Sequence, residues 1–189
     1  RIMRGRAARR APFALALLAA TFGIVACGGG GGETTTAVPD KEADAAILNH
    51  VLGRQLAAVD AYGAVLGRLG GLDLAAARRF RAQEQEHVDA LIKALRGLGA
   101  RADPEPEEIE PEELEARRDA LVFLYEVESA TVDSELSAIS DLSSPWPPAL
   151  LGSIVANQAQ HLAFLRRALG AKPLDAIPSA FEDGTTAAP

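Results

Sequence analysis

The 189-residue chain has a single cysteine and few aromatic residues, which make up 5% of the sequence. One cysteine excludes an intrachain disulfide framework and any zinc site built from several thiolates. The formal net charge is −7, so the chain lacks the basic excess with which nucleic-acid-binding domains neutralise phosphates. Runs of β-branched residues are also rare, whereas alanine and leucine are abundant. This composition favours helices, so we expect an all-α protein that does not bind nucleic acid.

The first 26 residues contain no acidic residue, and their five arginines all lie within residues 1–10. An uncharged stretch of 16 residues follows and ends at Ala26, directly before the only cysteine, Cys27. A basic segment, an apolar segment and a small residue at the cleavage point are typical of a secretory signal peptide. A transmembrane helix would need roughly 20 apolar residues. The ending resembles a bacterial lipobox, which implies lipidation of Cys27 and an exported protein anchored to the membrane or cell envelope.

Composition divides the rest of the chain into three segments. Residues 27–39 are rich in glycine and threonine and are expected to form a flexible tether. Residues 40–171 are expected to fold as one helical domain. Residues 172–189, with two prolines in their first half, are expected to form a loose tail. The predicted organisation is therefore a lipoprotein signal peptide (1–26), a tether, one domain and a tail.

Strong helix breakers separate four helical stretches, expected at 41–69, 74–98, 111–142 and 148–169. Asp40 and Asp73 stand where the first two helices need N-caps, and Pro111 suits the first turn of the third. Short links predict antiparallel pairs of helices 1–2 and 3–4. The middle link of 13 residues can reach ~43 Å, which exceeds the ~37 Å of the second helix. The second and third helices are therefore expected to run parallel, with an up-down-up-down bundle as the alternative.

Each stretch carries apolar residues at alternating spacings of three and four, the pattern of a helix that faces a bundle core. A polar residue or pair interrupts every stripe near the middle of its helix. The six polar residues are Gln55, Glu84, His87, Glu128, Gln158 and His161. They fall at similar heights, so we expect one polar layer halfway along the bundle. Because an isolated buried charge is very costly, this layer needs internal pairing or a metal ion.

The spacing of the polar residues repeats between the two halves of the domain. Gln55 precedes Glu84 by 29 residues, and Glu128 precedes Gln158 by 30. In both halves a histidine follows the second residue three places later, and positions three apart share one face of a helix. The pattern predicts two copies of a helical hairpin, each of which supplies a lone polar residue and then a polar residue paired with a histidine.

The chain resembles the ferritin-like superfamily, specifically small bacterial ferritin-like-domain lipoproteins, in all four helices. The resemblance rests on ILNHVLGRQLAAVDAY (47–62), FRAQEQEHVDAL (80–91), LVFLYEVESATV (121–132) and IVANQAQHLAFLRRALG (154–170). It implies a four-helix bundle with up-down-down-up connectivity and a long crossover between helices 2 and 3. It also implies metal ligands at Glu84, His87, Glu128 and His161, and a tyrosine near the site at Tyr62.

Two positions depart from the ligand pattern of this family. The lone glutamate of the first helix corresponds to Gln55, and the glutamate of the fourth-helix motif corresponds to Gln158. Glutamine is a poorer ligand for iron than a carboxylate or an imidazole. The remaining acids, Glu84 and Glu128, supply two negative charges, which balance one divalent ion. The sequence therefore predicts a degenerate version of a di-metal site.

Three states of the layer stay open at this point. It could bind one divalent ion (Fe, Mn or Zn), or it could be metal-free, with protonated His87 and His161 balancing the carboxylates. A two-metal site would need a replacement acid, and Glu135 is a poor one because it lies ~10 Å further along its helix than Glu128.

Three functions correspond to these states. The first is an exported, lipid-anchored ferritin-like-domain protein with a reduced metal site and no assured catalysis. The second is a di-iron or di-manganese oxidoreductase of ferroxidase or peroxidase type, and the third is a non-catalytic scaffold or interaction lipoprotein. The membrane is the expected partner through the lipid anchor, while a homodimer and a protein partner stay open.

Overall fold

The computed structural model describes residues 38–105, 107, 109, 114–179, 184, 185 and 187–189. The predicted signal peptide, Cys27 and most of the tether therefore lie outside the described residues. The described part contains four α-helices and no strand: α1 (Lys41–Val65), α2 (Gly71–Leu98), α3 (Arg117–Asp141) and α4 (Pro147–Leu169). A short 3-10 helix, η1 (Leu66–Arg68), follows α1. The predicted all-α fold class is confirmed. None of the described helices combines the length and apolar character needed to cross a membrane.

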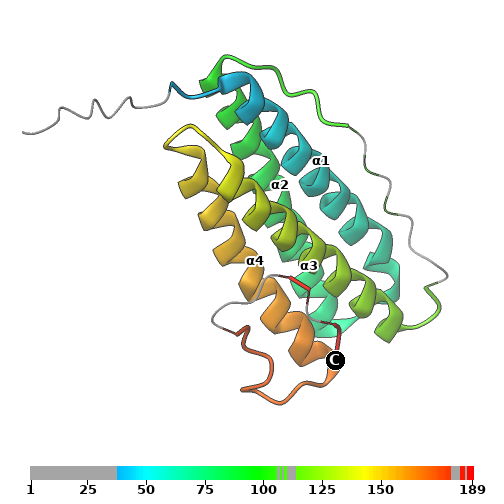
Figure 1. Cartoon of the computed structure of the whole chain (residues 1–189). Coiled ribbons are helices and arrows are strands. Elements are labelled where there is room, and N and C mark those ends of the chain that lie inside the picture. Colours follow the sequence, from blue (N-terminus) through cyan, green and yellow to red (C-terminus); the bar gives the residue numbers. More distant parts are fainter. Residues whose placement is uncertain (1–37, 106, 108, 110–113, 180–183, 186) are drawn as a thin grey trace, which may run out of the picture. The chain divides into compact units, whose positions relative to one another are not determined.

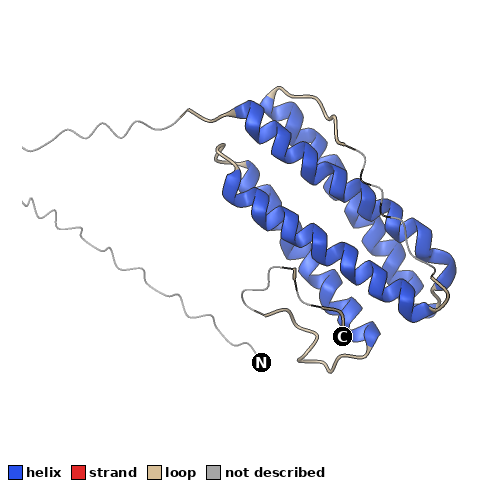
Figure 2. Cartoon of the chain, turned by 45° about the vertical axis from the view of Figure 1, so that its right-hand side comes forward, coloured by secondary structure: helices blue, strands red, loops and turns tan. Residues whose placement is uncertain are grey.

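The four helices form a bundle with the predicted connectivity (Figures 1 and 2). Helices α1 and α2 are antiparallel, as are α3 and α4, whereas α2 and α3 run parallel. After α2, the described residues of the link run back along the outside of α1 (Figure 1). Helix α1 packs against α2 and α3, and α4 packs mainly against α3. With this long crossover, all four helices pass through the middle section of the same bundle.

The crossover is fastened to α1 by three successive contacts. The Asn49 side chain donates to the carbonyl of Arg101 (3.3 Å) and accepts from the backbone N–H of Asp103 (2.8 Å). One turn later, a Cβ at Gly53 would lie only 2.7 Å from the carbonyl oxygen of Glu105, so glycine is needed for this close approach. Arg54 then forms an ion pair with Glu107 at 2.9 Å. These contacts fix the path that makes α2 and α3 parallel.

Residues at the ends of α1, α2 and α4 determine where these helices begin or stop. Asp40 caps α1 as predicted and accepts a hydrogen bond from the backbone N–H of Ala43 at 3.0 Å. Gly99 and Gly170 end α2 and α4 in the left-handed conformation, with φ of 84° and 108°. The prediction of Asp73 as N-cap of α2 is wrong, because the helix begins earlier, at Gly71, and Asp73 lies in its first turn.

Helix α3 begins later than the sequence predicts. Leu114–Ala116 are described and are not helical, and the helix starts at Arg117; Pro111 itself lies outside the described residues. The side chain of Asp119 accepts from the backbone N–H of Ala116 at 2.8 Å. This contact supplies a partner for an amide at the helix start, so it fixes the beginning of α3 there.

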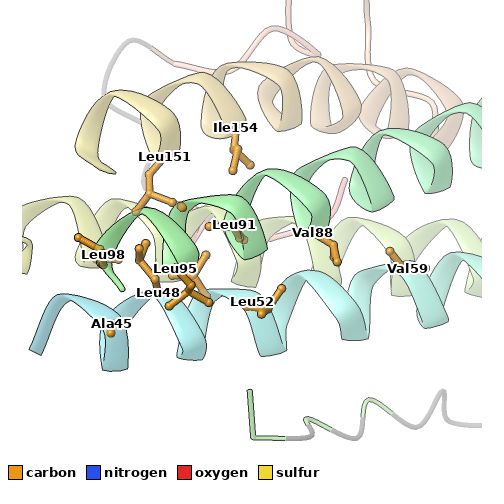
Figure 3. Packing of buried hydrophobic residues seen from close by; sticks show 13 residues of the cluster. Ala45, Leu48, Leu52, Val59, Val88, Leu91, Leu95, Leu98, Leu151 and Ile154 are labelled. Carbon is orange, nitrogen blue, oxygen red and sulfur yellow. The ribbon is translucent and has the colours of Figure 1, made fainter. Parts of the chain in front are cut away.

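Two apolar clusters occupy the two ends of the bundle (Figure 3 shows the first). The first joins the early part of α1 to the end of α2 and the start of α4, and the second joins the end of α1 to the early part of α3 and the end of α4. The largest buried side chains of the first cluster are Leu48, Leu52, Leu91, Leu95 and Leu151. Those of the second are Tyr62, Leu121, Leu124, Tyr125 and Leu165. Polar residues of all four helices lie between the clusters along the chain.

The described residues of segment 172–189 contact the helical body. Arg118 donates to the carbonyl of Pro189 at 2.7 Å. Gly184 has φ of 85° and lies so close to α3 that a Cβ there would overlap the carbonyl oxygen of Ser129. The segment that the sequence presents as a tail therefore touches α3 at these two places.

Candidate metal centre

Three of the six predicted polar residues converge in the middle of the bundle. Glu84 from α2, Glu128 from α3 and His161 from α4 each offer one ligand atom, and these atoms lie within 4.8 Å of one another. His161 Nδ1 is 2.9 Å from Glu128 Oε1 and 3.1 Å from Glu84 Oε1. The exposed fraction is 0% for both glutamates and 1% for the histidine. Three helices therefore aim one donor each at a point that is shielded from solvent.

Two more predicted residues hold the carboxylates of this group. His87 Nδ1 lies 3.1 Å from Glu84 Oε2, and the Tyr62 hydroxyl donates to Glu128 Oε1 at 2.5 Å. His87 is outside the three-residue group and contacts the far oxygen of Glu84 instead. Tyr62 likewise acts through Glu128. Each carboxylate is thus oriented by a neighbouring side chain that is not itself part of the three-residue group.

The two glutamines occupy different surroundings, although both are fully buried. Gln55 donates through Nε2 to Glu135 Oε1 at 2.6 Å. Gln158 makes no hydrogen bond to any described residue through either atom of its amide. An unpaired buried amide is costly, so Gln158 is a weak point of the metal-free layer.

Sequence reasoning undervalued Glu135 and missed Gln83. Glu135 lies outside the three-residue group, but its contact with Gln55 of α1 is not predicted by the sequence. Distance along one helix does not fix which residue a neighbouring helix brings alongside. Its position on the core stripe of α3 was the available signal. Gln83 Oε1 accepts a hydrogen bond from His161 Nε2 at 3.1 Å, and no feature of the sequence singled Gln83 out.

Several buried oxygens of the layer lack a protein partner. An imidazole Nδ1 carries at most one hydrogen, and that of His161 is directed to Glu128 Oε1, so Glu84 Oε1 has the ion pair but no hydrogen bond. Most buried polar groups in proteins have a hydrogen-bond partner, and a bound ion or an ordered water is one way to supply it. Among the described residues, the unpaired oxygens of this layer are Gln55 Oε1, Glu84 Oε1, Glu128 Oε2, Glu135 Oε2 and Gln158 Oε1.

The three-residue group carries charge because its members stabilise one another. Burial raises the pKa of Glu84, but hydrogen bonds and charges from His161 and His87 outweigh burial and hold that pKa below its usual value. Burial and the charge of Glu84 raise the pKa of Glu128 above its usual value. Burial lowers the pKa of His161, but Glu128 and Glu84 raise it to about 9. Without metal, a protonated His161 therefore balances the ionised Glu84 at neutral pH.

The neighbouring groups stay neutral for the opposite reason. Burial, together with the charges of Glu84 and Glu128, raises the pKa of Glu135 well above its usual value despite the hydrogen bond from Gln55. Burial and the charge of Glu128 also raise the pKa of Tyr62 well above its usual value. Burial therefore favours the protonated form of Glu135, and Tyr62 remains a hydrogen-bond donor.

The donor set fits one divalent ion and does not fit two. Two carboxylates and one imidazole are ligands that iron, manganese and zinc accept, and zinc sites with three protein ligands keep a position open. The charges of Glu84 and Glu128 balance one such ion, and each offers an unpaired oxygen. A second ion would depend on Gln55 and Gln158, which are neutral amides, and Glu135 lies outside the group.

Comparison with known proteins agrees with the bundle and its connectivity. The chain is similar to a solved structure titled as ferritin like, diiron-carboxylate proteins from Bacillus anthracis str. Ames, with a TM-score of 0.57 and 19% sequence identity. The similarity covers 69% of this chain and 98% of that chain. No curated protein matches the chain significantly. A family model described as a ferritin-like domain matches residues 42–171, which include all four helices, and the chain therefore belongs to the ferritin-like domain family.

Proposed function

We propose that this protein holds one divalent metal ion at the middle of its bundle, with Glu84, Glu128 and His161 as ligands. The observation that supports the proposal is the convergence of three donor atoms within 4.8 Å from three different helices. Fe(II), Mn(II) and Zn(II) all suit such a set of oxygen and nitrogen donors. When bound, the ion supplies a Lewis-acid centre. His87 and Tyr62 hold the two carboxylates in place.

We also propose that the domain works outside the cytoplasm as a lipoprotein. The basic, apolar and small-residue pattern of residues 1–26 supports export, and the cysteine at position 27 supports lipidation. Residues 27–39 would then tether the domain of residues 40–171 to the membrane. A subunit held by an acyl anchor is unsuited to a closed storage shell, so we propose metal binding at the envelope and not bulk iron storage.

The anchor is tested by Cys27→Ala in the full-length chain. The variant should keep its precursor mass and change its fractionation, because acylation and signal removal by the lipoprotein route both require Cys27. Unchanged membrane association together with an unchanged pattern of processing would contradict the lipoprotein proposal. The metal proposal would be unaffected, because its ligands lie in the helical domain.

Metal analysis of the full-length chain, purified without chelators, tests the metal centre. We expect one ion per chain. Two ions per chain would favour the di-metal oxidoreductase, and none would favour the scaffold; either result contradicts the proposal. Glu84→Gln and Glu128→Gln should lose the ion. The matched controls Glu86→Gln and Glu126→Gln lie two positions away on the same helices, are exposed, and should keep it.

A non-catalytic scaffold is the second candidate, because the layer can also balance its charges without metal. His161 lies within ion-pair distance of both glutamates, and Tyr62 donates to Glu128. In that case the layer only fixes how the helices align. Treatment with a strong chelator would then leave the melting temperature unchanged, whereas removal of a bound ion should lower it.

A further inference from the structure

We infer that Gln83 is the positioning residue that sets the orientation and tautomer of His161, so that Nδ1 is the nitrogen offered to the metal ion. The inference rests on the proposed metal centre and extends it by one residue. Gln83 belongs to α2 and directly precedes Glu84. One turn of α2 would therefore supply both a ligand and the group that orients a second ligand on α4.

The two nitrogens of the His161 ring face different partners. Nδ1 points to the carboxylates, 2.9 Å from Glu128 Oε1 and 3.1 Å from Glu84 Oε1, while Nε2 lies 3.1 Å from Gln83 Oε1. An amide oxygen can only accept a hydrogen bond, so Nε2 must carry the hydrogen. In a neutral imidazole this leaves the lone pair on Nδ1, directed at the centre. A partner on the second nitrogen fixes ligating histidines in this way in many metal sites.

Aromatic packing fixes the plane of the His161 ring but not which edge of the ring carries Nδ1. Phe80 stacks on His161 with ring centroids 4.0 Å apart and planes inclined by 26°, and Phe164 packs edge-on against Phe80 at 5.5 Å. A half-turn of the imidazole within this stack keeps nearly the same shape and replaces Nδ1 with a carbon. Only the polar contacts distinguish the two orientations. On the outer edge of the ring that contact is the hydrogen bond to Gln83.

Gln83 can be changed without opening the core, because it is only half-buried. Gln83→Leu removes the acceptor at similar size, and Gln83→Glu keeps an acceptor for the Nε2 hydrogen. Gln85→Leu is the matched control. Gln85 is an exposed glutamine two positions further along α2, and its side chain donates a hydrogen bond to Asp89 at 3.3 Å. The three variants separate loss of the acceptor from loss of a surface glutamine.

The experiment is a Zn(II) titration of the full-length chain in detergent, after removal of metal, in competition with a chromophoric chelator. We expect Gln83→Leu to weaken Zn(II) binding about 10–100-fold, the usual range for removing a partner of a ligating histidine. Gln83→Glu should bind close to the parent, and Gln85→Leu should match it. Nitrogen-15 spectra of the three histidines provide an independent signal. In the Zn(II)-loaded parent, His161 should show a protonated Nε2 and a metal-bound Nδ1, and Gln83→Leu should lose this single state.

Each contrary result has a distinct meaning. If the parent binds Zn(II) and Gln83→Leu binds equally well, the role of Gln83 is wrong while the metal centre stands. If Gln83→Leu and Gln83→Glu are weakened equally, the contact acts by packing and the inference is overturned. If the parent binds no Zn(II), the proposed metal centre fails and the inference fails with it.

Discussion

The two sides of the polar layer are equally buried but differ in charge. On one side Glu84, Glu128 and His161 form a charged group, and on the other Gln55 donates to Glu135, whose pKa is raised well above its usual value. Every one of these side chains is 0–1% exposed. Burial alone therefore does not decide which acids ionise in this core. The charges around each acid also matter: two histidines lower the pKa of Glu84, whereas the charge of Glu84 and burial raise the pKa of Glu128 although His161 is 2.9 Å away.

The three donors of the charged group come unequally from the two helical hairpins. The first hairpin contributes Glu84, and the second contributes Glu128 and His161. The glutamines stand once in each hairpin, at Gln55 and Gln158. The three donors come from α2, α3 and α4 and meet at one point, so the described part of the layer contains one group of potential ligands.

The charged side should be the more sensitive to loss of one member. Glu128→Ala removes a ligand and leaves His161 and Tyr62 without their shared partner. We expect the metal ion to be lost and the metal-free protein to be destabilised by about 3–5 kcal/mol, because a cavity opens in the core and the buried Tyr62 hydroxyl loses its acceptor. Urea unfolding and metal analysis measure both effects, with the exposed Glu126→Ala as control. A loss of stability similar to that of the control would show that the contacts of Glu128 do not stabilise the fold.

Making the neutral side acidic should erase the difference between the two sides. Gln55→Glu with Gln158→Glu restores the acids of the family pattern but sets a new carboxyl against Glu135. Without metal, the double variant should be less stable than the parent by a few kcal/mol, on the order of 2–4, because extra like charge is buried. Added Fe(II) or Mn(II) should then raise its melting temperature more than that of the parent. Equal metal-induced shifts would mean that the layer is not a reduced di-metal site.

Removing the amide on the neutral side should weaken the fold and leave the metal in place. Gln55→Leu deprives Glu135 of its hydrogen-bond donor and should cost about 1–3 kcal/mol of unfolding free energy. Metal content should stay at the parental value, because Gln55 is outside the three-residue group. Loss of the ion in this variant would place Gln55 in the metal centre. Gln85→Leu, on the exposed face of α2, controls for the change of residue type.

Glu135 should make the neutral side sensitive to pH. Its pKa in the folded protein lies well above the ordinary value of 4.5, so the folded state holds a proton that the unfolded chain releases. This costs stability once the pH exceeds about 4.5, and the cost grows with pH until the folded pKa is reached. Glu135→Gln should therefore gain stability over the parent as pH rises from 4 to 8. A constant difference between the two proteins across this range would contradict the raised pKa.

The sequence by itself determined the helices and the faces that they bury. Period-3.6 stripes, the Asp40 cap and the stops at Gly99 and Gly170 are local features, so each can be read within one helix. The long middle link predicted parallel α2 and α3. The repeated spacing also placed Glu84, Glu128 and His161 at one level, where the structure brings them together. Lipidation of Cys27 stays a prediction.

Only the tertiary structure decided which polar residues touch. The pairs Gln55–Glu135 and Gln83–His161 each join two helices, and so depend on how far one helix is shifted and rotated against the other. That shift is set by the crossover fastened along α1 and by the apolar clusters at both ends, none of which is encoded in a single helix's periodicity. The start of α3 at Arg117 has the same origin, because a helix end is fixed by whichever partner its free amides find.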